Sequence, residues 1–237
     1  MNLSRNKRPL YQQIKNIIKD RILHGFYPLE TNIPSEPLLE EEFGVSKITV
    51  RNAIKELVQE GYLETSSGKG TKVIRNTSTS KRSTWKRFTE VLVEEGHVIH
   101  KVLLSAESVT HEEGRKPHSL FGSSGLRIER LYVLDDSPYI HYTHYFPAWI
   151  GGVDPAELDA QSLYGWMEER KVTIAKFRDE FAVAPPPPGV EALLKCGKDT
   201  PLLKRYRYAY DESGSVVEYS EGYYRSELQP YVVNYDV

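Results

Sequence analysis

The stretch EEFGVSKITVRNAI, residues 41–54, decides the fold of the first part of this chain. Gly44-Val45-Ser46 forms a tight turn, with a short helix predicted before it from Ser35 onward and a longer helix over 47–60. Ser35 and Ser46 both stand where a helix N-cap is expected. At about 100° per residue, one side of the longer helix collects the apolar side chains Val50, Ala53, Ile54 and Leu57. Two helices joined by a short turn predict a helix-turn-helix.

The flanking segments extend this unit on both sides. Apolar side chains recur at helical spacing over 9–24, so an earlier amphipathic helix is predicted there. Gly61 ends the longer helix, and the runs 62–64 and 71–74 are strand-like around a tip of small residues that contains Lys69. The sequence therefore predicts a winged helix-turn-helix, in which a two-stranded wing follows three helices.

The polar side of the longer helix has the chemistry that duplex DNA requires. A helix amino end presents free N–H groups to phosphates, and long donors on an exposed helix face reach base edges in the major groove. The alternative is a helical subdomain whose charged face is merely solvated. The polar side carries Thr49, Arg51, Asn52 and Lys55, with Lys47 at the amino end.

Composition and charge divide the chain after this unit. The stretch 75–83 is polar, rich in Ser and Thr, and contains no apolar residue, which is typical of a linker. Residues 1–75 hold 12 Lys and Arg against 9 Asp and Glu, whereas the remainder holds 19 against 24. The overall charge of −2 therefore hides a basic part and an acidic part. We expect a DNA-binding domain over 1–75, a linker over 76–83 and a second domain over 84–237.

The wider composition excludes several classes of protein. A single cysteine, Cys196, rules out an intrachain disulfide and a multi-cysteine zinc site. No apolar run approaches the ~20 residues needed to span a bilayer. The start of the chain lacks the apolar core of a secretory signal. We therefore expect a cytoplasmic protein with no membrane partner.

Residues 84–237 alternate strand-like and helical segments. Helices are predicted over 85–95, 162–170 and 189–195. Two long hairpins are predicted, one around Asp135-Asp136-Ser137 and the other around Asp211 to Gly214, with strands over 125–134, 138–146, 202–210 and 216–224. Shorter strands are expected over 98–104 and 180–184. Long hairpins interspersed with helices indicate an α+β domain around an antiparallel sheet.

The segments PLYQQI, IPSE, EEFGVSKITVRNAI, LVQEGYLE and GKGT resemble, in order and spacing over 9–75, the DNA-binding domain of GntR-family bacterial transcription regulators. Lys47 and Lys69 stand where the family generally has Arg, and Glu30 stands where a turn Gly is common. Lysine keeps the charge but loses the bidentate fork that reads guanine, so Arg51 is the better candidate for a base contact. The resemblance implies DNA contacts by Ser35, Lys47, Thr49, Arg51, Gly68 and Lys69.

The second part also has a counterpart. RIERLYVLDDSPYIHYTHYFP, SLYGWMEE and TPLLKRYRYAYDESGSVVEYSEGYYRSEL resemble the UTRA domain of the HutC-type branch of that family, over most of 83–230. The resemblance implies a chorismate-lyase-like fold that senses a small molecule, often a sugar phosphate, an amino-acid derivative or another organic acid.

The site that this resemblance implies departs from the family at several positions. Arg130 and Tyr132 stand where sugar-phosphate binders have Arg-x-Arg, and Tyr142 stands where a Glu is common. Arg87 and Thr89 lie in the helix opening, while Ser162, Tyr164, Glu218 and Tyr224 match the family. We expect these residues to hold an anionic or polyhydroxylated ligand through charge-assisted and phenol hydrogen bonds. The alternative is that Arg87 and Arg130 only pair with Glu90 and Glu129 at the surface.

Other chemistries find little support in the sequence. His141 and His144 have a spacing seen in metal sites, but a strand places residues three apart on opposite faces. No Gly-x-Ser-x-Gly elbow or other nucleophile setting occurs. We therefore predict no catalytic residue, no metal and no cofactor, and we expect a protein that is not an enzyme.

The resulting hypothesis is a ligand-responsive regulator that binds a double-stranded DNA operator. We expect a homodimeric repressor, released from a palindromic site when a sugar phosphate, sugar acid or other organic acid binds the second domain. Two rivals stay open from the sequence. One is a lyase-like enzyme acting on an organic acid, and the other is a constitutive DNA-binding dimer.

Overall fold

The computed structural model describes residues 9–77, 88–155, 158 and 163–232, apart from the side chains of 88–90. The described residues form two compact units, one drawn from Met1–Ile99 with Val232 and one from His100–Tyr231. The predicted boundary at 75 and the predicted linker over 76–83 stay a prediction, because most of that linker lies outside the described residues.

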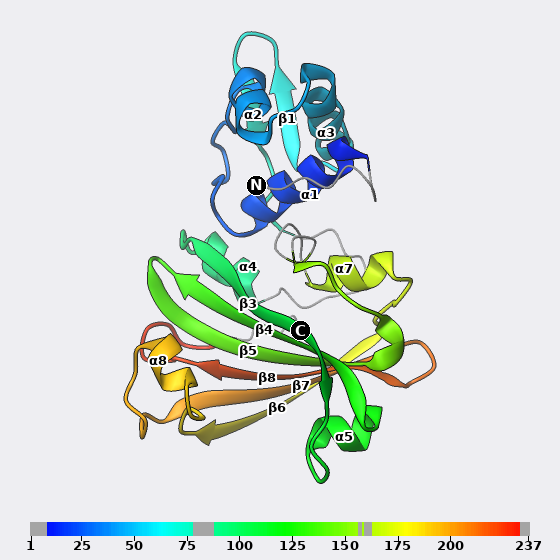
Figure 1. The fold of residues 1–237 in the computed structure, drawn as a ribbon. Helices are drawn as coiled ribbons and strands as arrows, with labels where there is room; N and C mark the ends of the chain where they lie inside the picture. Colours follow the sequence, from blue (N-terminus) through cyan, green and yellow to red (C-terminus); the bar gives the residue numbers. More distant parts are fainter. Residues whose placement is uncertain (1–8, 78–87, 156–157, 159–162, 233–237) are drawn as a thin grey trace, which may run out of the picture. The chain divides into compact units, whose positions relative to one another are not determined.

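Three helices and a hairpin build the first unit (Figure 1). The helices are α1 (Leu10–Leu23), α2 (Glu36–Phe43) and α3 (Lys47–Gln59), and the hairpin joins β1 (Leu63–Ser66) to β2 (Gly70–Val73). A further helix, α4 (Phe88–Glu94), follows. The winged helix-turn-helix predicted from the sequence is confirmed. Its wing strands run to Ser66 and begin at Gly70, so they extend closer to the tip than expected.

The apolar faces of the three helices form the core of this unit. The four isoleucines of α1 from Ile14 to Ile22 are buried, as are Leu39 and Phe43 of α2. The predicted apolar side of α3 is buried in full. Lys15 binds Glu56 at 2.9 Å and Glu60 at 3.0 Å, which ties α1 to α3.

The turn between α2 and α3 differs in one detail from the sequence expectation. Gly44 is left-handed, with φ of 61°, so glycine suits the end of α2. Ser35 and Ser46 occupy the N-cap positions with extended backbone, but neither hydroxyl makes the cap hydrogen bond. The Ser46 hydroxyl instead bonds the Thr49 hydroxyl at 2.9 Å.

The second unit is built on a six-stranded sheet in the order β3-β4-β5-β8-β7-β6. The pairings β4–β5, β5–β8, β8–β7 and β7–β6 are antiparallel, as expected for the α+β class. The strands are β3 (Ile99–Thr110), β4 (Ser124–Leu134), β5 (Ser137–Pro147), β6 (Lys176–Ala184), β7 (Leu202–Tyr210) and β8 (Val216–Tyr224). β7 and β8 have the predicted bounds. β3 and β6 are longer than predicted.

Short helices cover both faces of this sheet. Figure 1 shows α7 (Leu163–Glu169) and α8 (Val190–Leu194) on opposite sides of it. Leu163, Trp166 and Met167 of α7 pack on β4 and β5, in a core that includes Ile128 and Phe146. Val190 and Leu194 of α8 pack on the other face, against Leu202 and Tyr223. The helix α5 (Lys116–Phe121) and the short 3-10 helix η1 (Ala148–Ile150) were not expected from the sequence.

The turn between β4 and β5 has the backbone conformation that its sequence predicts for a hairpin. Asp135 and Asp136, between β4 and β5, have φ of 44° and 69°. Two successive positive φ values are the requirement of a type I′ turn, and Asp is one of the few residues that accepts them.

Gly222 of β8 lies where the sheet leaves no room for a side chain. It pairs with Tyr142 on β5 and with Arg205 on β7. A Cβ at Gly222 would lie 2.4 Å from Cε1 of Tyr142, which is far inside van der Waals contact. The missing side chain therefore lets the Tyr142 ring lie against β8.

We predict that Gly222→Ala destabilises the second unit by about 1–3 kcal/mol, because an added methyl group must push the Tyr142 ring away. Gly152→Ala is the matched control, since a Cβ there meets nothing within 4 Å. Urea unfolding followed by tryptophan fluorescence measures both variants, because Trp149 and Trp166 lie in the second unit. Equal unfolding midpoints for the two variants would show that the ring does not depend on Gly222.

Candidate DNA-binding face and effector site

The outer side of α3 presents the polar residues that the sequence singled out. Lys47 and Arg51 are exposed, and Thr49 is half-buried beside Ser46. Arg51 is 56% exposed and its Nε donates to Glu36 at 2.8 Å, so α2 holds this guanidinium in place. Ile48 is also 63% exposed at the start of α3. An apolar residue on this face was missed by the sequence reasoning, because its exposure depends on the packing of the three helices.

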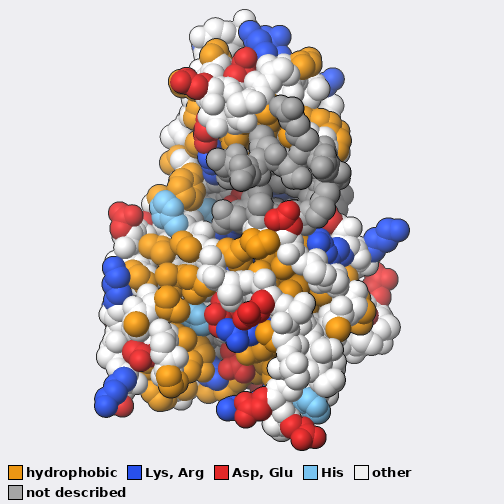
Figure 2. Space-filling view, viewed as in Figure 1, with side chains coloured by type: hydrophobic (Ala, Val, Ile, Leu, Met, Phe, Trp, Pro, Cys, Tyr) orange, Lys and Arg blue, Asp and Glu red, His pale blue; other side chains and the backbone are white. Residues whose placement is uncertain are grey.

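The wing tip has the geometry of a tight glycine turn. Gly68 and Gly70 both have positive φ, at 73° and 95°. The Asn32 amide donates to the Lys69 carbonyl at 2.9 Å, which joins the tip to the segment before α2. Lys69 is exposed. Figure 2 shows Lys and Arg side chains gathered at the end of this unit that carries the hairpin. Ser35, the remaining predicted contact, is exposed at the start of α2.

The second unit gathers polar side chains on the sheet face that α7 covers. Alternate residues of a strand share a face, and the register aligns Arg130, Tyr142, Gly222 and Arg205 in one row across β4, β5, β8 and β7. The neighbouring row aligns His144, Ser220, Arg207 and Asp179. We call these residues, together with Glu218, Tyr224 and Tyr164, the buried polar cluster.

Arg205 is held by phenols. It is 6% exposed, and its guanidinium donates to the hydroxyls of Tyr142 at 2.5 Å and Tyr231 at 3.0 Å. The Tyr142 hydroxyl also bonds that of Tyr224. Burial raises the pKa of Tyr142 and of Tyr224, so both phenols are neutral at physiological pH. The nearest carboxylate oxygen, on Asp179, lies 4.0 Å away.

His144 and Glu218 form a second contact within the cluster. The His144 Nδ1 lies 2.8 Å from Oε1 of Glu218, and both residues are buried. Burial lowers the pKa of His144, against the opposing effect of Glu218, so the ring is neutral. A neutral ring that donates from Nδ1 leaves Nε2 as an acceptor.

Arg207 and Asp179 make a bidentate ion pair, with hydrogen bonds of 2.7 and 2.6 Å. Burial raises the pKa of Asp179, but the hydrogen bonds from Arg207 outweigh it and hold the pKa below its ordinary value. Arg130 differs, because it is 1% exposed and its guanidinium donates to the Leu158 carbonyl at 2.8 Å.

Several buried polar atoms of the cluster have no hydrogen-bond partner among the described residues. They are Nε of Arg205, Nε2 of His144, Oε2 of Glu218 and Oγ of Ser220. Buried polar groups in native proteins are nearly always bonded, so this concentration of unpartnered atoms on one face makes the cluster a candidate ligand site.

The structure therefore brings together five of the effector residues implied by the resemblance: Arg130, Tyr142, Tyr164, Glu218 and Tyr224. Tyr132 adjoins them, with its ring in an edge contact with Tyr142 at 5.5 Å. Arg87 and Ser162 lie outside the described residues, and of Thr89 only the backbone is described, in α4.

The surface alternative for Arg130 is wrong. Arg130 is buried beneath α7, and Glu129 instead pairs with Arg127 at 2.8 Å. A strand places residues 129 and 130 on opposite faces, which is why the two cannot pair. The alternative for Arg87 stays untested, because Arg87 lies outside the described residues.

Arg205, Arg207, His144 and Ser220 were missed as site residues. A signal was present for the two arginines, since Arg-x-Arg in a strand places both side chains on one face. His144 was considered only as a metal ligand. It lies on the opposite face of β5 from His141, as expected from their spacing. In the described part of the chain, no group of three or more His, Cys, Asp or Glu side chains is suited to hold a metal ion.

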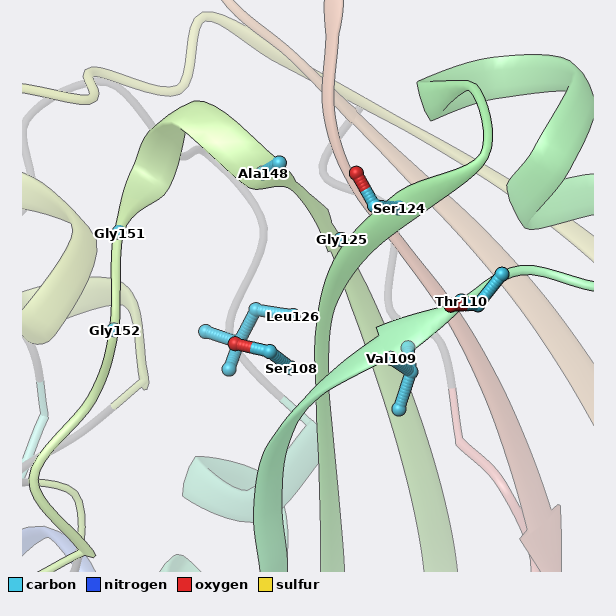
Figure 3. A pocket seen from close by; sticks show the side chains of 9 residues that line it. All are labelled: Ser108, Val109, Thr110, Ser124, Gly125, Leu126, Ala148, Gly151 and Gly152. Carbon is cyan, nitrogen blue, oxygen red and sulfur yellow. The ribbon is translucent and has the colours of Figure 1, made fainter.

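A separate open cleft of about 360 Å³ lies near the ends of β3 and β4 and beside η1 (Figure 3). Its walls carry no charged side chain, and it contains none of the cluster residues. The lining consists of Ser108, Val109, Thr110, Ser124, Gly125, Leu126, Ala148, Gly151 and Gly152.

A winged helix-turn-helix joined to a unit with a buried polar cluster defines a DNA-binding regulator with a sensing domain. Residues 10–73 match the family described as bacterial regulatory proteins, gntR family, and residues 94–228 match the UTRA domain. The chain belongs to the gntR family and carries a UTRA domain. It is a ligand-responsive DNA-binding transcription regulator.

Named relatives are similar over nearly their whole length. The repressor NagR of Bacillus subtilis (strain 168) is 25% identical over 98% of this chain and 97% of its own length. The mannosyl-D-glycerate transport/metabolism system repressor MngR of Escherichia coli (strain K12) is 25% identical over 93% of each chain. The crystal structure of PhnF from Mycobacterium smegmatis has a TM-score of 0.51 and 25% identity, covering 88% of this chain and 92% of PhnF. No helix among the described residues is long and apolar enough to cross a membrane.

We predict that Asp179→Asn lowers the free energy of unfolding of the second unit by about 2 kcal/mol at pH 7, because Arg207 loses its charged acceptor. The depressed pKa of Asp179 also gives a pH dependence. Its stabilisation is fully present above the unfolded-state pKa of about 3.9 and is lost as pH falls further towards the folded-state pKa.

The wild-type protein should therefore lose stability below about pH 4 more steeply than the variant. Urea unfolding followed by tryptophan fluorescence at pH 3 to 7 measures this difference. Glu180→Gln, at the exposed neighbouring position on the other face of β6, is the control. Parallel pH profiles for wild type and Asp179→Asn would contradict the assignment.

Proposed function

We propose that this protein is a homodimeric repressor that binds a palindromic operator and leaves it when a small anionic, hydroxylated metabolite enters the buried polar cluster. The first domain, proposed over 1–75, supplies the DNA contacts. The second domain, proposed over 84–237, supplies the effector site and the dimer contact, with the linker over 76–83 between them. We place the protein in the cytoplasm, where its operator is.

One observation carries the effector proposal. The cluster places three guanidinium groups on one covered sheet face, while four of its buried polar atoms have no partner among the described residues. Guanidinium groups bind carboxylates and phosphates through charge-assisted hydrogen bonds, which strengthen away from water. One relative carries a name that refers to mannosyl-D-glycerate, a hydroxylated organic acid. Its name supports the same class of ligand here.

The DNA proposal rests on α3 and the wing. Arg51 and Lys47 are exposed on α3, and Lys69 is exposed at the wing tip. The pair Arg51–Glu36 is a pre-formed surface contact that holds the guanidinium in position before DNA binds. Ser35, Thr49 and Gly68 complete the proposed contact set by resemblance. A dimer presents two copies of this surface, and a palindrome offers two matching half-sites.

Release follows from a difference in binding energy. An effector that binds one arrangement of the two DNA-binding domains better than the other shifts the population towards it. The operator affinity of the effector-bound protein then falls by a coupling free energy. The effector affinity of the operator-bound protein falls by the same amount.

We predict that Arg51→Ala weakens specific operator binding by about 1–3 kcal/mol, which is the value expected for loss of a base contact. Fluorescence anisotropy with labelled operator DNA measures the affinity. Arg115→Ala removes an exposed arginine from the second unit and should leave the affinity unchanged. If Arg51→Ala binds operator as tightly as wild type, Arg51 does not contact DNA.

We predict that Arg130→Met removes effector-dependent release while leaving operator affinity in the absence of effector unchanged. Methionine keeps the length and the apolar packing but removes the charge that holds the ligand. Arg127→Met is the control, because Arg127 lies on the opposite face of β4 and pairs with Glu129.

The effector is first found by a thermal-shift screen of sugar acids, sugar phosphates and amino acids, because a ligand specific for the native state raises its melting temperature. Normal release of the Arg130→Met protein by that effector would show that the buried polar cluster is not the effector site.

A further inference from the structure

The buried polar cluster offers two kinds of polar group. Arg130 on β4 and Arg205 on β7, which stand three strands apart in one row, offer donors and positive charge. Glu218 and His144 offer acceptors, beside the hydroxyl of Ser220. A ligand that satisfies both kinds of group carries an anionic group and a set of hydrogen-bond donors.

Both arginines have neutral hydrogen-bond partners among the described residues, and the carboxylate of Asp179, 4.0 Å from Arg205, is already bound bidentately by Arg207. Arg130 donates to the Leu158 carbonyl, and Arg205 donates to the phenols of Tyr142 and Tyr231. The Nε of Arg205 has no partner among the described residues. Neutral acceptors satisfy the geometry of a guanidinium but leave its charge uncompensated, so both side chains favour an anion nearby.

Arg205 lies where it can replace a missing family charge. The resemblance implies a second Arg at position 132, and this chain has Tyr132 there. The Tyr132 ring packs on Tyr142, and the Tyr142 hydroxyl accepts a hydrogen bond from Arg205. Because Gly222 has no side chain, the Tyr142 ring can lie against β8, between Tyr132 on β4 and Arg205 on β7. A chain of contacts thus links position 132 to a guanidinium three strands away.

The tautomer of His144 decides which atoms of the cluster can accept hydrogen bonds. Its Nδ1 donates to Oε1 of Glu218, which leaves Nε2 as an acceptor. Oε2 of Glu218 is a second acceptor, and neither atom has a donor among the described residues. Two adjacent buried acceptors without donors call for hydroxyl or ammonium hydrogens from a ligand.

The net charge of the cluster distinguishes a carboxylate ligand from a phosphate ester and from a ligand that also carries an ammonium group. The described cluster holds the cations Arg130, Arg205 and Arg207 against the carboxylates Asp179 and Glu218, with His144 neutral. One positive charge is left among the described residues, without Arg87, which lies outside them. A single carboxylate neutralises it, whereas a phosphate monoester brings about −1.5 to −2 and overshoots. An ammonium group on the ligand would cancel the carboxylate and leave the cluster positive again.

We infer that the effector is a hydroxylated monocarboxylic acid, a sugar acid in chemical class, and that Arg205 determines this specificity. Arg205 supplies the positive charge for the ligand carboxylate. Glu218 and His144 accept hydrogen bonds from the ligand hydroxyls. This inference rests on the proposed function and deepens it, because it names the class of effector.

The test uses the full-length protein and a panel built on one carbon skeleton. D-Gluconate and D-glucuronate, with aldonates and uronates of three to five carbons, carry both features. Hexanoate keeps the carboxylate without hydroxyls, sorbitol keeps the hydroxyls without charge, and gluconate 6-phosphate adds a phosphoryl group. Isothermal titration calorimetry measures binding, and anisotropy with operator DNA measures release.

We expect at least one sugar acid to bind at least tenfold more tightly than each of its matched controls. Arg205→Met should weaken this binding by about tenfold to a hundredfold, as for a lost charge-assisted hydrogen bond. The urea unfolding midpoint of the ligand-free variant, followed by tryptophan fluorescence, shows whether its second unit is folded. Arg178→Met, an exposed arginine on β6, should bind the acid like wild type.

The outcomes distinguish the inference from the function on which it rests. If a sugar phosphate or an amino acid releases the operator and no sugar acid binds, the protein remains an effector-released repressor and the inference is overturned. Full binding of the acid by Arg205→Met overturns the role of Arg205. If the whole panel and the wider metabolite screen leave both melting temperature and operator affinity unchanged, the proposed function fails as well.

Discussion

The second unit depends on how its sheet accommodates arginine side chains on a covered face. Burial of a guanidinium without a partner costs several kcal/mol, so each one has to find acceptors. Arg207 finds a carboxylate, whereas Arg205 and Arg130 find phenols and a carbonyl. Only the first arrangement neutralises the charge. The described part of the face therefore has positive charge left over and four buried polar atoms without a partner, which is the condition under which an anion with hydrogen-bond donors binds well.

Tyrosine makes this arrangement possible. A phenol brings an apolar ring for packing and a hydroxyl that accepts from arginine, so it fits a dry site that needs hydrogen bonds. Tyr142 does both, because its ring lies against β8 at Gly222 and its hydroxyl reaches Arg205 and Tyr224. The family's Glu at this position would instead have placed a negative charge beside Arg205. The exchange of one side chain thus changes the charge that the site offers to its ligand.

The first unit meets a different constraint. Its apolar helix faces close on one another, and polar side chains are left on the outer side of α3 and on the wing. Nothing in that core requires Lys47, Arg51 or Lys69. Their presence is explained by a polyanion outside the molecule, and the basic first part and acidic second part keep this attraction at one end of the chain.

The sequence by itself determined the helix-turn-helix, the wing, the two long hairpins and the family. These features follow from local patterns, such as the apolar spacing of α3 and the two aspartates of the β4–β5 turn. Local patterns involve residues that are near one another in the chain, so the sequence alone shows them. It did not determine the composition of the buried polar cluster. Arg205 and His144 enter the cluster because β5, β8 and β7 are neighbours in the sheet, although β5 lies far from the other two in the chain. Strand order and register decide which distant side chains share a covered face, and burial there decides which charges stay uncompensated.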